Sequence, residues 1–340
     1  MIALYGWLSL HWLPFLLVVS GGCLLGYMLL ESVFTKGAPP MSTRRKLMLS
    51  TWHDQTEAQV YGIISVNADP LLAYLDAQAR VASPEGDSSS ASAPSKISVT
   101  TACIKAVAMA MKEAPGLNSR IVFGQFVPRP SVDVSCLVAL DDGTDLAVAK
   151  LNRCDTKTLG ELHADMRAKA DRLRKHKDKD FEASKPLMSM LPVWLLTPLV
   201  SVIGYLAGAL GLNIPALGVR PFPFGSVMVS SVGMLGVEQA FIPFTPFARV
   251  PFLLMVGECA PKAIVDPVDK KTIRVQHMLT LTGTLDHRFA DGTEAARLAK
   301  RLKYVLEHPE ECMNDTTPML TQEQRDAEKK AKREAAKKAQ

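Results

Sequence analysis

Residues 286–292 read DHRFADG, and they follow residues 273–284 (IRVQHMLTLTGT), in which apolar and polar side chains alternate. Such alternation predicts a β-strand with one buried face, here formed by Ile273, Val275, His277, Leu279 and Leu281. The acid and glycine that close the motif predict a turn into a helix. His287 therefore stands at a strand end, four residues before Asp291, and an imidazole is suited to general acid–base chemistry near neutral pH. The segment predicts a rigid strand end that presents a catalytic histidine.

Shorter segments elsewhere predict the remaining elements from their periodicity. The predicted strands are residues 59–66, 132–138, 146–151, 227–231 and 252–257. The predicted helices are residues 69–80, 96–114, 155–176 and 294–308, and the Ser/Ala/Pro/Gly-rich residues 83–95 predict a mobile loop. Because strands and helices are mixed without a clean βαβ repeat, the fold class is predicted as α+β rather than a doubly wound sheet.

Composition narrows the class of protein. The chain has 340 residues, of which 48% are apolar and 21% charged, and its mean hydropathy is +0.10. These values exclude disorder as the main state and predict a globular domain with a limited amount of membrane-facing sequence. The net charge is +5, and residues 321–340 supply seven basic and four acidic side chains, which is +3 and leaves +2 for the rest. We therefore expect no nucleic-acid partner.

The cysteines do not predict a metal centre or a disulfide framework. No two of them have CxxC spacing, and no Cys/His cluster has the spacing of zinc ligands. Isolated cysteines in apolar surroundings usually behave as small buried hydrophobic residues, and this usage suits a reducing compartment. The six positions are Cys23, Cys103, Cys136, Cys154, Cys259 and Cys312.

The first thirty residues contain no Asp, Glu, Lys or Arg. About 20 apolar residues cross a bilayer as a helix, so residues 1–34 are predicted to be a transmembrane anchor. A cleaved signal peptide is the alternative, but it requires a basic start, and the first ten residues carry no positive charge. Basic residues follow the tract at Lys36 and at residues 44–46, and the positive-inside rule places this side, with the catalytic body, in the cytoplasm.

Several segments together resemble one family. The motif at residues 286–292 resembles that of the catalytic domain of the dihydrolipoyl acyltransferases of 2-oxoacid dehydrogenase complexes, which share the chloramphenicol acetyltransferase fold. Further segments resemble this family in the same order along residues 43–312. They are residues 96–118 (KISVTTACIKAVAMAMKEAPGLN), 132–138, 156–166, 229–236 (VSSVGMLG) and 294–309. The resemblance implies a two-layer mixed sheet with flanking helices. No lipoyl domain, lipoyl attachment site or peripheral-subunit-binding segment is expected in this chain.

The resemblance also implies a mechanism and an assembly. It implies a homotrimer, or a multiple of trimers, with active sites between subunits and with coenzyme A or its thioester as substrate. His287 would be the general base, and Ser230, or failing it Ser231, would stabilise the tetrahedral oxyanion. Asp291 would hold the loop or the imidazole, and an N-cap of the following helix is compatible with that role. No acyl-enzyme and no metal are implied.

Residues 186–219 form a second uncharged tract, of 34 residues. A single crossing would separate two halves of one domain, and two crossings need about 40 residues and a turn. Prolines and glycines also interrupt the tract. We expect a bent helical hairpin, inserted in the family's domain, that enters the near leaflet or lies on it; the alternative is an apolar patch buried against another subunit.

The main hypothesis is a membrane-anchored, coenzyme A-dependent acyltransferase with a hydrophobic acceptor. One alternative is the acyltransferase core subunit of a divergent 2-oxoacid dehydrogenase complex that uses lipoyl domains from another chain. A second alternative is an inactive trimeric membrane scaffold. The charged tail, residues 313–340, is expected to be either a solvated helix or disordered, with no catalytic role.

Overall fold

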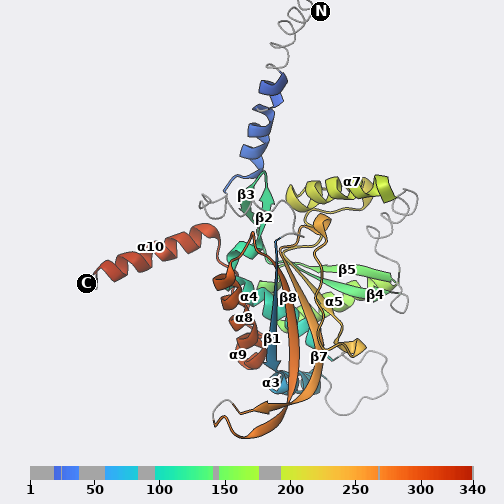
Figure 1. Cartoon of the computed structure of the whole chain (residues 1–340), viewed down its shortest axis with the longest axis vertical. Helices are drawn as coiled ribbons and strands as arrows, with labels where there is room; N and C mark the ends of the chain where they lie inside the picture. The colour runs from blue at the N-terminus through green and yellow to red at the C-terminus, as the bar shows by residue number, and fades with distance from the viewer. Residues whose placement is uncertain are drawn as a thin grey trace, which may run out of the picture.

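A six-stranded mixed sheet forms the centre of the protein (Figure 1). The computed structural model describes residues 19–23, 25–37, 58–82, 96–140, 145–175, 193–266 and 269–338. The sheet order is β1-β8-β7-β6-β4-β5, with β4, β6 and β7 parallel and the other neighbours antiparallel. Its strands are β1 (Gln59–Asn67), β4 (Val134–Leu140), β5 (Asp145–Leu151), β6 (Val227–Ser231), β7 (Phe252–Val265) and β8 (Ile273–Asp286). A separate hairpin joins β2 (Ser119–Val122) and β3 (Gln125–Pro128).

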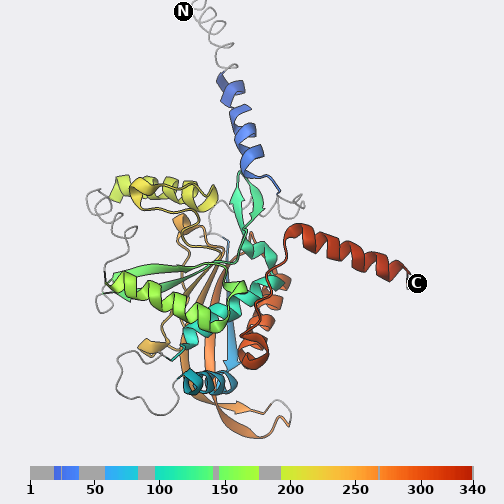
Figure 2. The same cartoon turned by 180° about the vertical axis from the view of Figure 1, so that it is seen from behind.

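Helices cover one face of this sheet, as the two opposite views show (Figures 1 and 2). They are α3 (Asp69–Ala82), α4 (Val99–Ala110), α5 (Leu159–Arg174), α8 (Gly292–Glu307) and α9 (Pro309–Cys312). The central helix, α4, is buried on every side from Thr101 to Ala110, which is why its sequence is apolar almost throughout. The predicted α+β class with a mixed sheet and flanking helices is confirmed.

The alternation along β8 predicts burial correctly for only part of the strand. Leu279 and Leu281 are buried as predicted, but Ile273 and Val275 are 67% and 74% exposed. The physical reason is that the β7–β8 hairpin runs on past the helical layer and projects from the body (Figure 1). The outer half of the predicted apolar face therefore has no layer to pack against, and its burial was wrongly predicted.

The second uncharged tract is not a helical hairpin within its described part, residues 193–219. It forms one helix, α7 (Val193–Ile203), then a π-helical segment Gly204–Ala209 and a short turn Pro215–Leu217. A Cβ at Gly204 would lie 2.4 Å from the carbonyl oxygen of Phe247, so this glycine lets the segment pack directly on the body. This docking takes the place of a returning helix, and residues 186–192 lie outside the described part.

The ends of the chain are described only in part. Residues 19–23 and 25–34 are helical, and the other residues of the predicted anchor lie outside the described ranges. Among the residues that the structure describes, no helix is both long enough and apolar enough to span a membrane. The predicted loop at residues 83–95 also lies outside them. In the tail, α10 (Gln322–Lys338) is a polar helix that projects from the body (Figure 1).

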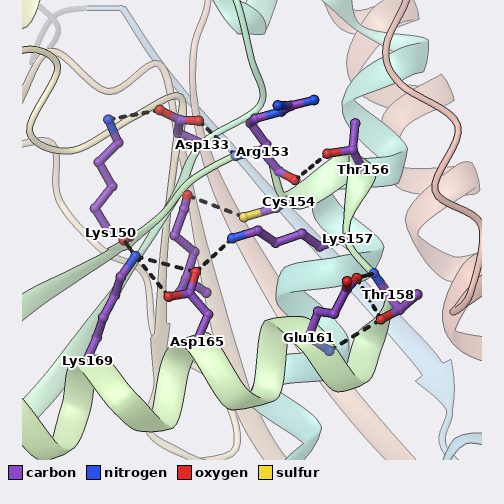
Figure 3. Close-up of polar contacts among 11 residues, drawn as sticks. Asp133, Lys150, Arg153, Cys154, Thr156, Lys157, Thr158, Glu161, Asp165 and Lys169 are labelled. Atoms are coloured by element: carbon purple, nitrogen blue, oxygen red, sulfur yellow. Dashed lines mark hydrogen bonds and ion pairs between the residues drawn. The ribbon is translucent and has the colours of Figure 1, made fainter.

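The first turn of α5 is fixed by polar contacts that the sequence pattern did not reveal (Figure 3). Thr158 and Glu161 form a reciprocal capping box, which satisfies two backbone N–H groups at the start of the helix. One turn later Asp165 accepts from Lys157 at 2.8 Å and pairs with Lys169 at 3.3 Å. Lys169 Nζ also donates to the carbonyl oxygen of Lys150 on β5, and this contact holds α5 against the β4–β5 edge of the sheet.

Lys105 joins α4 to two distant segments. The residue is fully buried, and its Nζ donates to the carbonyl oxygens of Asp155 (3.2 Å), Lys157 (2.7 Å) and Asp315 (2.6 Å). Burial lowers the pKa of its amine below the ordinary value. Three carbonyl groups that would otherwise lack a donor are satisfied by one ammonium, so this residue links α4, the start of α5 and the segment after α9.

Replacing Lys105 tests this link. Lys105→Met keeps most of the side-chain volume but leaves the three carbonyl groups without their donor, so we expect the free energy of unfolding to fall by about 2–4 kcal/mol. Urea unfolding followed by circular dichroism measures the loss, with Lys300→Met on the exposed face of α8 as the matched control. Equal unfolding midpoints for the two variants would contradict the assigned role.

Candidate active site

The turn that carries His287 is fastened to two neighbouring segments by its backbone. The N–H of His287 donates to the carbonyl oxygen of Ala58 at 2.8 Å, just before β1. One residue earlier, the N–H of Asp286 donates to the carbonyl of Pro251 at 3.0 Å, just before β7. His287 thus leaves the sheet from the end of β8, with its backbone held between the starts of β1 and β7.

The acid and the arginine on either side of His287 form a buried ion pair. Asp286 is fully buried and Arg288 is 6% exposed. The Asp286 Oδ1 accepts from Arg288 Nε at 3.0 Å, and Oδ2 accepts from Nη2 at 2.7 Å. Burial raises the pKa of the Asp286 carboxyl, and the guanidinium acts against this rise. These two residues of the motif are structural: they brace the turn, a role that the sequence analysis did not assign to them.

A second support reaches the histidine turn from residues 115–118. A Cβ at Gly116 would lie 2.4 Å from the carbonyl oxygen of Phe289, so only glycine permits this close approach. The Phe289 ring also meets Phe126 of β3 edge-on, with ring centroids 5.3 Å apart. Residues 115–118 (Pro-Gly-Leu-Asn), at the end of the family-like segment 96–118, therefore support the turn that carries His287.

Asp291 is the N-cap of α8. Its carboxylate accepts from the N–H groups of Thr293 and Glu294, both at 3.0 Å, while the Glu294 carboxylate accepts from the N–H of Asp291. This reciprocal box begins α8 directly after the histidine turn. Of the roles predicted for Asp291, the structure shows the capping role, which fixes the loop that carries His287.

The structure does not bring Ser230 and His287 of one chain together. Ser230 on β6 is level with Met255 on β7, and Met255 is level with Thr282 on β8. His287 lies two strands away and five residues beyond Thr282, which puts the two residues roughly 20 Å apart. Ser231, one position along the same strand, does not close this distance. One reacting carbonyl must lie about 3 Å from both groups, so within one chain they cannot act together.

Buried cysteines offer no competing nucleophile. Burial raises the pKa of Cys103, Cys136 and Cys154 to about 12, which keeps these thiols protonated near neutral pH. Cys312 is also buried, whereas Cys23 is exposed. Across the described ranges, no group of His, Cys, Asp and Glu side chains is arranged to hold a metal ion.

Comparison with protein families gives one match that covers most of the chain. Residues 35–185 and 219–314 match the family described as 2-oxoacid dehydrogenases acyltransferase (catalytic domain). The chain belongs to this family. The match skips residues 186–218, so α7 and the π-helical segment lie outside the part that the acyltransferase domain shares with its family.

Curated relatives of this acyltransferase-family chain are longer proteins. The chain is 26% identical over 214 residues to the dihydrolipoyllysine-residue acetyltransferase component of the pyruvate dehydrogenase complex of Zymomonas mobilis, covering 63% of the chain and 38% of that protein. It is also 26% identical over 208 residues to the lipoamide acyltransferase component of the branched-chain alpha-keto acid dehydrogenase complex of Bacillus subtilis, covering 61% and 38%. The chain therefore spans less than half the length of these relatives.

Solved structures of this family share the fold. The cubic core of a pyruvate dehydrogenase multienzyme complex superposes with a TM-score of 0.54 and 23% identity, over 81% of this chain and 93% of that one. The dihydrolipoamide acetyltransferase of Azotobacter vinelandii gives 0.53 and 23%, over the same shares. In that Azotobacter enzyme, a serine, a histidine and an asparagine have been investigated for their role in the catalytic mechanism.

The charge of Asp286 neutralises a buried arginine and that of Asp291 caps a helix, which predicts effects of different size for the same substitution. Asp286→Asn leaves the buried Arg288 without its counter-charge, so we expect a loss of about 3–5 kcal/mol in the free energy of unfolding. Asp291→Asn keeps a good N-cap, so we expect a change within about 0.5 kcal/mol. Denaturant unfolding of both variants measures this difference, and losses of equal size would contradict the assigned roles.

Proposed function

We propose that this protein transfers an acyl group between the thiol of coenzyme A and a dihydrolipoyl thiol carried on another chain. The observation that carries the proposal is His287, braced at the end of β8 in a chain of the acyltransferase family. This was an alternative at the level of sequence, and membership of the family supports it better than the hydrophobic-acceptor hypothesis.

In this reaction His287 accepts the proton of the attacking thiol, and the thiolate attacks the carbonyl carbon of the thioester. The electron pair of the carbonyl moves to its oxygen, and the resulting oxyanion accepts a hydrogen bond from the Ser230 hydroxyl. The intermediate collapses, the carbon–sulfur bond of the original thioester breaks, and the departing thiolate takes the proton from His287. Thiol and thioester exchange partners, so no acyl-enzyme and no external reductant are needed.

The separation of Ser230 and His287 supports an active site shared by two copies of the chain. Because roughly 20 Å divides them in one chain, a common site requires His287 from one subunit and Ser230 from its neighbour. Apolar side chains in the segment that follows β6, and on the edge strand β1 that this segment reaches at Phe241, supply a surface for such a contact, since they are exposed in the single chain. They are Met234, Leu235, Val237 and Phe241, with Tyr61 and Ile63 on β1. We infer a homotrimer or a multiple of trimers, as the resemblance implies.

A second candidate function keeps the chemistry and changes the acceptor. The uncharged insertion packs on residues 246–248, just before β7 begins, at the end of the sheet where β8 leads to His287. An apolar wall at this end of the sheet favours a hydrophobic acceptor over a soluble lipoyl domain. The two candidates differ only in which thiol, hydroxyl or amine enters the side of the site opposite to coenzyme A.

The shared site predicts complementation between two inactive variants. We expect His287→Ala to lower kcat by about 10³-fold and Ser230→Ala by about 10²-fold. Co-expression of the two variants with different tags, in equal amounts, forms mixed trimers in which about a third of the interfaces pair an intact histidine with an intact serine. We therefore expect the doubly purified trimers to regain about a third of the wild-type activity.

Two controls make this measurement specific. Co-expression of His287→Ala with a His287→Ala/Ser230→Ala double variant supplies no intact histidine and should regain nothing. His277→Ala changes the other histidine of β8, which pairs with Asp69 at the far end of the strand, and should keep wild-type kcat. Absence of recovery in the mixed assemblies, with both proteins present, would refute the two-subunit site.

The acceptor is tested by direct competition. Purified protein is incubated with acetyl-coenzyme A, free dihydrolipoamide and an extract of membrane lipids, and products are identified by mass spectrometry. The proposal predicts S-acetyl-dihydrolipoamide that is absent with His287→Ala. Acylated lipid as the sole product dependent on His287 would favour the hydrophobic acceptor and overturn the lipoyl proposal.

A further inference from the structure

The two uncharged tracts, far apart in the sequence, meet at one end of the molecule. Tyr27 of the N-terminal helix meets Phe123 edge-on with ring centroids 5.0 Å apart, and Phe123 meets Tyr205 of the π-helical segment at 6.3 Å. Phe34 and Tyr205 pack in one apolar cluster with Val122, Val127 and Ala209. The β2–β3 hairpin thus joins residues 19–34 to the insertion, so that the two tracts share a base.

Beyond this base, residues 19–34 expose apolar side chains in every direction around the helix. The exposed set is Val19, Leu25, Tyr27, Met28, Leu29, Leu30 and Val33, between 44% and 67% exposed. At 100° per residue, positions 25 to 33 of this set are distributed around the whole helix circumference. A second protein covers one face of a helix, whereas lipid covers all of them, so this distribution favours a bilayer as the occupant.

The sequence before Val19 continues the same character. Residues 1–18 add eighteen positions without a charged side chain, so the uncharged stretch reaches residue 30, longer than the about 20 residues that a bilayer requires. The first basic residue after it is Lys36, and residues 44–46 (RRK) follow. Such basic residues complement the anionic headgroups of the cytoplasmic leaflet.

The direction of α7 in the insertion is that of a helix lying along the surface of a bilayer into which the N-terminal helix inserts. In both views α7 runs crosswise to residues 19–34, at the level where that helix meets the body (Figures 1 and 2). Gly204, Ala207 and Gly208 of the π-helical segment after α7 are buried and pack on the body. Val202 of α7 and Leu212, which follows the π-helical segment, are 55% and 39% exposed. A helix held in this direction, with apolar residues outward, suits the interface of a membrane and not its interior.

We propose that residues 19–34 and α7 form one membrane-docking surface for a phospholipid bilayer. Residues 19–30 enter the bilayer, residues 31–34 hold the helix to the body, and α7 lies in the headgroup region of the leaflet nearest the body. This places the acyltransferase body against the cytoplasmic face, with the β7–β8 hairpin directed away from the lipid. The proposal concerns the position of the enzyme and is independent of which acceptor it uses.

Fluorescent labels at defined positions test the surface in the full chain. The native Cys23 is exposed on the N-terminal helix and is labelled directly with an NBD maleimide. Cys259 is partly exposed, so it is replaced by Ser in every labelled protein. In a Cys23→Ser/Cys259→Ser background, single labels are placed with Val202→Cys, Leu212→Cys and, as the matched control, Val275→Cys. Val275 is likewise apolar and is 74% exposed, but it lies near the start of β8, in the β7–β8 hairpin that projects from the opposite end of the body.

The protein is reconstituted into vesicles of phosphatidylcholine and phosphatidylglycerol. We expect NBD emission at positions 23, 202 and 212 to shift to the blue, to rise several-fold over the protein without lipid, and to be quenched by doxyl-labelled lipids. A shallow doxyl label should quench positions 202 and 212 more than a deep one, and a deep label should quench position 23. Position 275 should stay accessible to aqueous iodide and unaffected by the lipid quenchers.

Two results would overturn the proposal. Iodide-accessible labels at both 202 and 212, indistinguishable from 275, would show that α7 faces water. Labels at these positions that are shielded from iodide but not quenched by any doxyl lipid would show that another copy of the chain covers α7. Because the readout is fluorescence, it stands whether or not the lipoyl acceptor is correct.

Discussion

The register of β8 between β1 and β7 is the constraint on which the rest of the site depends. β8 pairs with β1 from Met278 to Asp286 and with β7 along its length, apart from one bulge near Gly257. Because side chains alternate with a period of two, a slip by one residue would turn every inward side chain outward. This double pairing fixes where the strand ends, and the buried ion pair of Asp286 and Arg288 then fixes how His287 leaves it.

The same register separates the two residues that we propose for catalysis. β6 and β7 are parallel and β8 is antiparallel to them, so the end of β6 and the end of β8 point in opposite directions. Ser230 and His287 stand at those two ends. Exposed apolar residues beside Ser230 supply the surface on which a neighbouring copy can complete the site. Under the proposed function, catalysis and assembly therefore have one structural cause.

The N-terminal helix and the insertion that contains α7 pack on the acyltransferase body without pairing with its sheet. α7 and the π-helical segment fall between family-matched parts of the chain and pack through glycines against the β6–β7 connection. The N-terminal helix reaches the same place through the β2–β3 hairpin. The fold can carry them because both attach at one end of the molecule, beside loops, where extra chain disturbs no strand pairing.

The sequence alone determined the fold class and the elements on either side of His287. Alternation along residues 273–284 and the motif at 286–292 predicted the strand that carries His287 and the helix that follows it, because these features depend on local spacing. The mixture of strands and helices without a clean βαβ repeat predicted the α+β class. The packing around the turn depends on contacts between distant segments: the carbonyl of Ala58, the approach of Gly116, and the three carbonyls on Lys105. No local pattern encodes which backbone groups will meet in space. Tertiary structure alone therefore decided that Ser230 and His287 lie apart, and that two uncharged tracts share one end of the molecule.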